Sequence, residues 1–295
     1  MHKYKKLLLL LIISLTFISC SSEYDKKLKI SATTWIGYTP LYYAQEMGWL
    51  DELNIKLLNV SSLSENMYIY KSGNSDAYVG TQYEYNLLSK SDHSLKPIMM
   101  FDRSYGGDII MSNTSIKTLQ STTGQIEAYL EMDSINSTIL EDFLSKYKID
   151  GKKIKYTNMD QAEIKTLKVE NVNTNSLIIT YIPYNYQLEE NGFKEIASTK
   201  DSLDIFVVDA MFTTHKTLYK HKKQFIELKK LVDRAVTVVN NNPKAFFEKI
   251  KPYMLDITYD EFVDSLNDII WINKDMNDNV KQRMEKAKLP TVNLL

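Results

Sequence analysis

The segment TWIGYTPLYYA at residues 34–44, followed shortly by Gly48, joins the first expected strand to the first expected helix. An alternating stretch at residues 28–34 predicts a strand, and Thr39-Pro40 predicts the start of a helix with Thr39 as its N-cap. Gly48 is a typical helix stop. Ligands of open α/β sheets bind beyond the carboxyl ends of strands, near helix N-termini, so this turn is a candidate binding wall. The alternative is a turn whose aromatic rings only pack locally.

The same alternation of strand and helix patterns continues along the chain. Strands are expected at residues 55–60, 76–80, 97–101, 107–111, 125–131, 154–157, 177–182 and 205–208. Helices are expected at residues 64–72, 82–90 and 136–146. This order indicates parallel sheets covered by helices. From Phe212 onward we expect helices only, one of them starting at a capping box formed by Thr258 and Glu261. The expected fold class is α/β with a helical C-terminal part.

Residues 1–19 have the features of an export signal, with a cationic head, an apolar core at residues 7–13 and a small residue at the end. The core is too short to span a bilayer about 30 Å thick, although a retained membrane anchor is the alternative. Cys20 is the only cysteine, so it cannot form a disulfide within the chain. Residues 17–20, FISC, resemble the lipobox of bacterial lipoproteins. That resemblance implies lipidation of Cys20 and a short polar tether at residues 20–27.

The charge balance argues against nucleic acid as a partner. Of the 36 basic side chains, Lys3, Lys5 and Lys6 lie in the expected signal, which leaves 33 against 37 acidic ones, a net charge of about −4. Such a chain has no basic excess to neutralise phosphates. The 20 tyrosines favour surfaces that are part apolar and part wet, such as ligand clefts. The alternative is that most of them are ordinary half-buried rings.

The residues offer little catalytic chemistry. The histidines after the signal are His93, His215 and His221. Six positions separate the last two, so one helix face does not present both to a metal, and the lysines around them indicate a solvated face. The sequence contains no Gly-Lys-Ser phosphate loop, nucleophile elbow or dinucleotide fingerprint. We therefore expect no enzyme activity, no cofactor and no metal.

An ordered set of motifs resembles the taurine, alkanesulfonate, nitrate and thiamine-pyrimidine binding proteins of ABC importers. The segments that carry this resemblance are residues 35–44 with Gly48, KSGNSDA at 71–77, residues 81–87 with Glu84, DRSYGGD at 102–108, YIPY at 181–184 with Gly192, Val208-Asp209, Asn242-Pro243 and Trp271. Together they cover nearly all of the expected mature chain.

The resemblance implies a type 2 periplasmic-binding-protein fold, in which two α/β lobes close on a ligand like a Venus flytrap. Lobe 1 would comprise residues 28–103 plus 204–295, and lobe 2 would comprise residues 104–203. The two crossings, near Ser104 to Gly106 and near Ser202-Leu203, would form the hinge, because glycine absorbs large backbone changes at little cost.

The segments that the resemblance assigns to the cleft supply the candidate ligand-binding residues. These are Trp35, Gly37, Tyr38, Thr81, Glu84, Asp102, Ser104, Asp108, Asp133, Asn136, Tyr181, Tyr184 and Asp209. Arg103 is the only basic residue in the same segments. Carboxylates with aromatic faces suit a cation or a stacked heterocycle, so we expect a neutral or cationic small molecule such as an amine or a pyrimidine. The alternative is that these acids only cap helices and hold the hinge.

One segment departs from the family pattern. Residues 124–134, GQIEAYLEMDS, carry Glu127, Glu131 and Asp133 where the family has small residues. This acidity argues against a sulfonate or nitrate ligand.

Three functions fit these expectations. The first is the solute-binding lipoprotein of an ABC importer, a monomer anchored to a bacterial membrane on the extracytoplasmic side and serving an ABC permease. The second is a ligand-sensing protein that signals to a membrane receptor kinase. The third is an exported enzyme of the same fold. The yeast-type pyrimidine synthases share this fold and consume an internal histidine, but the export signal and the few histidines argue against that activity.

Overall fold

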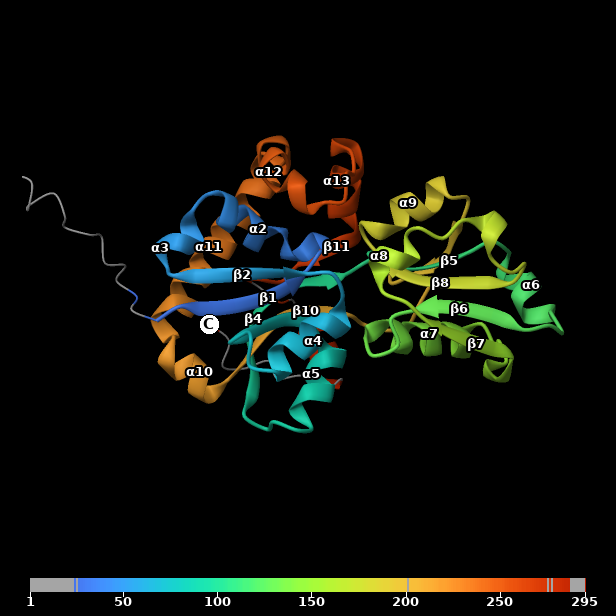
Figure 1. Ribbon diagram of the computed structural model, residues 1–295, viewed down its shortest axis with the longest axis horizontal. Helices are drawn as coiled ribbons and strands as arrows, with labels where there is room; N and C mark the ends of the chain where they lie inside the picture. The colour runs from blue at the N-terminus through green and yellow to red at the C-terminus, as the bar shows by residue number, and fades with distance from the viewer. Residues whose placement is uncertain (1–23, 25, 201, 275, 277, 287–294) are drawn as a thin grey trace, which may run out of the picture.

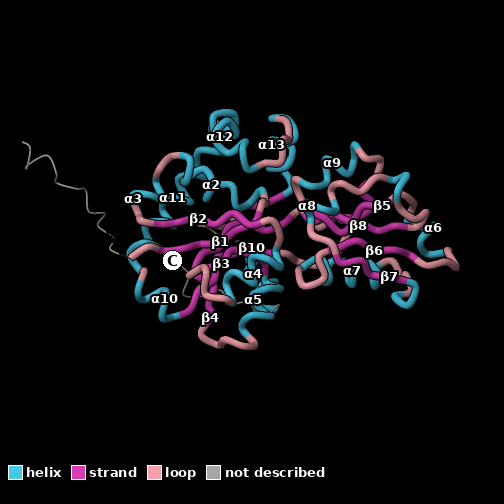
Figure 2. Tube along the Cα trace, viewed as in Figure 1, coloured by secondary structure: helices cyan, strands magenta, loops and turns pink. Residues whose placement is uncertain are grey.

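The computed structural model describes residue 24 and residues 26–200, 202–274, 276, 278–286 and 295. The expected export signal and Cys20 lie outside these residues. Two lobes lie side by side, each with strands at its centre and helices on the outside (Figures 1 and 2). No helix within the described ranges is both long and apolar enough to cross a membrane.

The first lobe is built on a six-stranded sheet with the strand order β11-β4-β10-β3-β1-β2. Its strands are β1 (Leu28–Thr33), β2 (Ile55–Val60), β3 (Ala77–Thr81), β4 (Leu95–Ser104), β10 (Val208–Thr214) and β11 (Ile269–Trp271). Its α-helices are α2 (Thr39–Glu46), α3 (Trp49–Glu52), α4 (Leu63–Lys71), α5 (Gln82–Ser89), α10 (His215–Lys220), α11 (Lys222–Asn241), α12 (Pro243–Ile250), α13 (Tyr259–Ser265) and α14 (Asp278–Lys286). Its 3-10 helices are η1 (Ile36–Tyr38), η4 (Lys251–Tyr253) and η5 (Leu266–Asp268).

The second lobe is built on a five-stranded sheet with the strand order β7-β6-β8-β5-β9. Its strands are β5 (Asp108–Ser112), β6 (Ile126–Leu130), β7 (Ile154–Asn158), β8 (Ser176–Tyr181) and β9 (Lys194–Ser198). Its helices are α6 (Ile116–Ser121), α7 (Ile135–Lys146), α8 (Gln161–Ile164) and α9 (Tyr184–Glu190), with 3-10 helices η2 (Gly151–Lys153) and η3 (Val169–Asn171).

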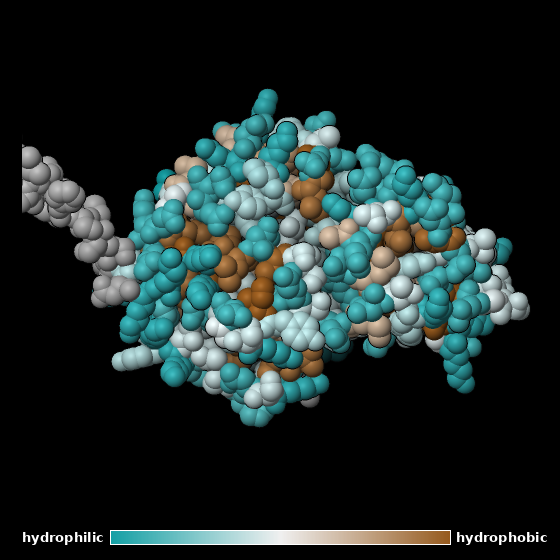
Figure 3. Space-filling view, viewed as in Figure 1, coloured by the Kyte–Doolittle hydropathy of each residue, from teal (hydrophilic) through white to brown (hydrophobic). Residues whose placement is uncertain are grey.

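The central strands are buried on both faces, which explains why their sequences are almost continuously apolar. All five residues of β3, β5 and β6 are buried, and Leu28, Ile30 and Ala32 of β1 are fully enclosed. Helices cover the sheets, while the visible surface is mostly hydrophilic, with apolar residues in separate small patches (Figure 3). Most of the buried apolar residues form one continuous core that includes both sheets, and a second, smaller cluster around Tyr78, Tyr85 and Phe212 lies in the first lobe.

Most predicted elements are present, and the expected parallel pairing occurs in both sheets, where β6 also pairs in parallel with β7 and β8, but each sheet contains antiparallel pairs as well. β1 pairs with β2 and β3 in parallel, whereas β10 runs antiparallel to both β3 and β4. In the second lobe, β5 runs antiparallel to β8 and β9. The chain leaves the first sheet after β4 and returns at β10, so the returning strand enters from the opposite direction.

Two strand boundaries and one helix cap also differ from the predictions. The strand expected at residues 205–208 begins at Val208 and runs to Thr214, because the buried Asp209 interrupts its apolar pattern. β11 lies where only helices were expected, since three residues are too few to show a period. The N-cap of α2 is Tyr38, and the Thr39 hydroxyl instead donates to the Ile36 carbonyl at 2.7 Å. The capping box at Thr258 and Glu261 is confirmed.

The chain passes between the lobes at residues 105–107 and again at residues 199–207. Hydrogen bonds tie the two crossings together. The hydroxyl oxygens of Ser104 and Thr199 lie 2.7 Å apart, and the Gly106 N–H donates to Thr199 Oγ1 at 3.0 Å. Gly106 has a φ of +125°, a conformation that other residues rarely adopt. This glycine therefore allows the sharp turn from β4 into β5.

Candidate ligand-binding site

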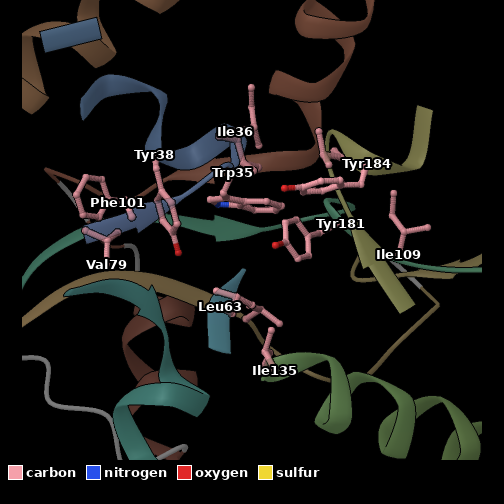
Figure 4. Packing of buried hydrophobic residues seen from close by; sticks show 14 of the residues in the cluster. Trp35, Ile36, Tyr38, Leu63, Val79, Phe101, Ile109, Ile135, Tyr181 and Tyr184 are labelled. Atoms are coloured by element: carbon pink, nitrogen blue, oxygen red, sulfur yellow. The ribbon is translucent and has the colours of Figure 1, made fainter. Parts of the chain in front are cut away.

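A small cavity lies between the lobes. Its lining residues are Thr33, Trp35, Tyr38, Leu63, Thr81, Asp108, Ile135, Tyr181, Val207 and Asp209. About 20 Å³ is open to the centre of a water-sized sphere, which is room for about one water molecule. In Figure 4 the hydroxyl groups of Tyr38 and Tyr181 point into the space between Trp35 on one side and Leu63 and Ile135 on the other. The structure is therefore a closed state with a nearly filled cleft.

The first lobe supplies an aromatic wall whose polar ends bind buried carboxylates. The Trp35 indole N–H donates to Asp102 Oδ1 at 3.2 Å. The Tyr38 hydroxyl donates to Asp209 Oδ1. Trp35 and Tyr38 are 5 % and 1 % exposed, and both carboxylates are buried as well. Each ring is thus fixed in orientation by a carboxylate from a neighbouring strand, β4 or β10.

Gly37, between these two aromatic residues, permits the close approach of the turn to β4. A methyl group at Gly37 would lie 1.8 Å from Asp102 Oδ2 and 2.6 Å from Trp35 Nε1. Real carbon atoms do not approach so closely. The absence of a side chain at this position therefore holds the indole against the carboxylate.

The second lobe supplies the opposite wall. The Tyr181 ring packs edge-on against Trp35 across the cleft, with ring centres 6.0 Å apart, and edge-on against Tyr184 at 5.3 Å. Asp108 begins β5 directly after the first crossing, and its backbone N–H donates to Ser104 Oγ at 3.1 Å. The first crossing thus positions the Asp108 carboxylate at the cavity.

Two glutamates join helix N-termini around the cleft. Glu84 belongs to the capping box of α5, and its Oε1 also accepts the N–H of Ile135 at the start of α7 in the other lobe, at 3.1 Å. Glu131 accepts the N–H groups of Gln161 at 3.2 Å and of Leu63, in the first lobe, at 3.4 Å. Each glutamate therefore reaches from its own lobe to a helix N-terminus of the other.

Burial raises the pKa values of the carboxyl groups at the cleft. It raises the pKa of Asp108 to about 7 and the pKa of Glu131 to about 8. Burial also raises the pKa of Glu84. The pKa values of Asp102 and Asp209 are well above their ordinary range, because burial is reinforced by Asp108 in one case and by Asp102 in the other. The cleft therefore holds carboxyl groups that keep their protons near neutral pH.

The structure brings most of the predicted site residues together, with two exceptions. Trp35, Tyr38, Thr81, Asp108, Tyr181 and Asp209 line the cavity, while Gly37, Glu84, Asp102, Ser104 and Tyr184 contact these residues or the hinge. Asp133 is exposed and does not line the cavity. Asn136 is buried beneath the wall, where its Oδ1 accepts from Gln161 Nε2 at 3.2 Å.

Sequence reasoning missed four lining residues and one bridging acid. Thr33, Leu63, Ile135 and Val207 complete the lining, and Glu131 joins the lobes. Leu63 and Ile135 are first residues of helices that follow strands, each after a serine N-cap, and this signal could have revealed them. Val207 lies in an irregular segment and carries no such signal.

The expected solvated face around the histidines is wrong for His221. This side chain is 1 % exposed, and its Nδ1 lies 2.6 Å from Gln224 Oε1. His215 is exposed at the start of α10. The residues that line the interlobe cavity include no histidine. Within the described residues, no group of three or more histidine, cysteine or acidic side chains could hold a metal ion.

The two lobes, their double crossing and the enclosed cavity define a periplasmic-binding-protein fold, as predicted. Solved structures support this assignment. A ligand-binding component of an ABC-type import system from Staphylococcus aureus, with zinc bound, has a TM-score of 0.72 at 13 % identity, over 92 % of this chain and 94 % of that one. The alkanesulfonate-binding protein from Xanthomonas axonopodis pv. citri, bound to MOPS, has a TM-score of 0.72 at 9 % identity, over 90 % and 92 %. The aliphatic sulphonate binding protein from Escherichia coli scores 0.68 at 11 % identity, over 89 % and 90 %.

A family model assigns the chain to a particular family within this fold. The chain belongs to the NMT1/THI5-like family, whose model matches residues 35–246. This match begins at Trp35, the first residue of the aromatic wall, and it confirms the resemblance predicted from the ordered motifs. No curated protein matches the chain by sequence.

Proposed function

We propose that the chain is the solute-binding lipoprotein of an ABC importer, which captures a small molecule between its lobes and delivers it to a membrane permease. The observation that carries this proposal is a cavity lined by Trp35 and Tyr38 from one lobe and by Asp108 and Tyr181 from the other. A site divided between two lobes suits capture by closure. Membership in the NMT1/THI5-like family and likeness to components of ABC import systems support the same function.

The proposed moving units are residues 28–103 with 204–295 and residues 104–203. This division into two moving units is supported by two observations: the two sheets share no strand, and the chain joins them only at the two crossings. The closed cavity has room for about one water molecule, so a larger solute needs the lobes to separate before it can enter. Closure would then bury it, and opening would release it to the permease.

The proposed solute is a neutral or cationic small molecule that packs against aromatic rings. Trp35, Tyr38 and Tyr181 offer those rings, and Thr81, Asp108 and Asp209 offer polar atoms from both lobes. The sulfonate-binding relatives bind anions, but the buried acids of this cleft disfavour one. Binding rather than catalysis is favoured because the cavity lining includes neither histidine nor cysteine.

A ligand screen tests this function. We expect thermal stabilisation of the purified protein by at least one member of a panel of amines, pyrimidines, sulfonates and amino acids. A ligand at one hundred times its dissociation constant should add about 2.7 kcal/mol. Unchanged melting with the whole panel, at millimolar concentrations, would contradict the proposal. Chemical turnover of a ligand that binds would point instead to an exported enzyme.

The proposed location is the extracytoplasmic side of a bacterial membrane, held by lipid on Cys20. Two or three acyl chains, at about 0.8 kcal/mol per buried methylene, suffice to hold a protein of this size at a membrane. We expect the native protein in the detergent phase of a phase separation and the Cys20→Ala variant in the aqueous phase. The same partition for both proteins would rule out the lipid anchor.

A further inference from the structure

The cleft contains buried carboxyl groups without basic partners. Glu84, Asp102, Asp108, Glu131 and Asp209 are all buried. Within the described part of the chain, none of them forms an ion pair, and no lysine or arginine is buried. Burying an unpaired carboxylate is costly, so such groups either keep a proton or await a cation.

The positive ends of helices at the cleft are already occupied. Helix N-termini bind anions readily, and α4, α5 and α7 all begin at the cavity. The Glu84 carboxylate accepts N–H groups of Thr81 and Ile135, and the Glu131 carboxylate accepts the N–H of Leu63. The chain's own acids thus take the positions where an anionic solute would bind.

Three buried polar atoms of cavity-lining residues lack a hydrogen-bond partner among the described residues. These atoms are Asp108 Oδ2, the Tyr181 hydroxyl and Thr33 Oγ1. Buried polar groups are almost always hydrogen-bonded, so unpaired ones at a binding cavity indicate a missing partner. An ionised carboxylate only accepts, and therefore the partner at Asp108 must donate.

The walls of the cavity suit the same chemistry. The rings of Trp35, Tyr38 and Tyr181 line it, and an aromatic face attracts a cation within about 6 Å of its centre. Trp35 and Tyr38 already use their polar ends on Asp102 and Asp209. Their rings remain available as apolar surface for the body of a solute.

We infer that the cavity binds a small organic cation with at least one N–H group, such as a protonated amine, which donates to Asp108 and packs against Trp35 and Tyr181. This inference rests on the proposed binding function and narrows its solute from neutral or cationic to cationic. Tyr181 and Thr33, one from each lobe, accept or donate the remaining hydrogen bonds. Binding then joins the two walls through the solute.

We expect binding of the cation to release the proton of the Asp108 carboxyl group. In the free protein burial raises the pKa of Asp108 to about 7, so its carboxyl group is mostly protonated at pH 6. The titratable groups that interact with it are Asp102 on β4, Asp209 on β10, Glu84 on α5 and Tyr181 on β8. Glu131 after β6 lies near Glu84 and Tyr181, and Lys200 at the second crossing is paired with Asp268 at 3.3 Å. An ammonium group favours the ionised carboxylate, and the displaced proton goes to the buffer. Affinity should therefore rise about tenfold per pH unit below pH 6 and level off above pH 7.

The test uses pairs of probes that differ in charge but hardly in size. Benzylamine is compared with benzyl alcohol and ethanolamine with ethylene glycol, and ethanesulfonate, nitrate and thymine are added as anionic and neutral probes. We expect the amine of at least one pair to bind at least tenfold more tightly than its alcohol at pH 7.5. Calorimetry at pH 6 in phosphate and in MES should show release of close to one proton.

Two variants assign the effect to Asp108. Asp108→Asn keeps the shape and should bind the amine at least tenfold more weakly, with no proton release. Glu127→Gln is the matched control, since Glu127 is a buried acid of the same lobe that already pairs with Lys155 at 2.9 Å. This control should keep both the charge preference and the proton release. Tyr181→Phe provides a second variant, which should weaken amine binding without abolishing proton release.

The possible outcomes distinguish failure of this inference from failure of the proposed solute-binding function. Tighter binding of an alcohol, thymine, ethanesulfonate or nitrate than of every amine would overturn the inference and leave a solute-binding protein. Amine binding that is unchanged in Asp108→Asn would also overturn it. Failure of every probe to bind would contradict the proposed function, and the inference would fall with it.

Discussion

The free protein should lose stability as the pH rises, and Asp108 should cause a measurable part of that loss. Its folded-state pKa of about 7 lies above the ordinary value of 3.8. A raised carboxyl pKa means that the folded state binds the proton more tightly than the unfolded state. The contribution of Asp108 to the free energy of unfolding is therefore greatest at low pH, and it is lost as the pH rises through the folded-state pKa.

The size of this effect follows from the two pKa values. For a shift from 3.8 to about 7, the linkage relation gives a loss of about 2 kcal/mol between pH 5.5 and pH 8. Asp108→Asn cannot ionise, so its stability should lack this component. In a chain of this size the difference amounts to about 3 to 4 °C in melting temperature.

The assay is thermal unfolding of both proteins between pH 5.5 and pH 8, without ligand. The variant should melt close to the native protein at pH 5.5 and clearly above it at pH 8. Glu52→Gln, on the exposed surface of α3, is the control and should follow the native curve. Parallel curves for native protein and Asp108→Asn would refute the claim that burial raises the pKa of this carboxyl group.

Other substitutions probe the geometry of the site. Gly37→Ala should cost about 1 to 3 kcal/mol in chemical unfolding, because its methyl group would lie 1.8 Å from Asp102 Oδ2, whereas Gly151→Ala meets no atom within 4 Å and should be nearly neutral. Tyr181→Phe should leave the melting temperature of the free protein unchanged or raise it, since the lost hydroxyl has no partner among the described residues; a clear loss would show that the hydroxyl is bonded. Glu84→Ala should cost about 1 to 3 kcal/mol and increase the radius of gyration in X-ray scattering, because it removes a helix cap and a bond between the lobes; an unchanged radius would argue against that bond as a latch.

Much of the fold could be predicted because the local signals agree with the final structure. Helix α5 begins at the capping box of Thr81 and Glu84, and β2 occupies residues 55–60 as its apolar pattern predicts. Strand direction could not be predicted in the same way. The antiparallel return of β10 depends on where the chain re-enters the first lobe, and β11 is too short to leave a periodic pattern.

The site was partly predictable for a related reason. Trp35 and Tyr38 flank a strand-to-helix turn, which is a local pattern, and the motif resemblance added Asp108 and Tyr181 from distant parts of the chain. Hydrogen bonds between residues on opposite sides of the cleft produce no recognisable sequence pattern. The reach of Glu131 to the N-terminus of α4 depends on how far the lobes close.

The distinction between acids that hold the fold and acids that await a solute also required the structure. From the sequence, the two roles are alternatives that cannot be assigned to particular residues. In the structure the two roles belong to different residues, because Glu84 and Glu131 accept backbone N–H groups, while Asp108 Oδ2 has no partner in the described residues. Both roles thus occur in the same cleft.

The most direct test of the account is a crystal structure of the protein with its most stabilising probe. We predict an organic cation between the lobes, with its N–H group within about 3 Å of the Asp108 carboxylate and its body against Trp35 and Tyr181. A probe bound outside the cleft, or one whose acidic group replaces Glu84 or Glu131 at a helix N-terminus, would contradict the account.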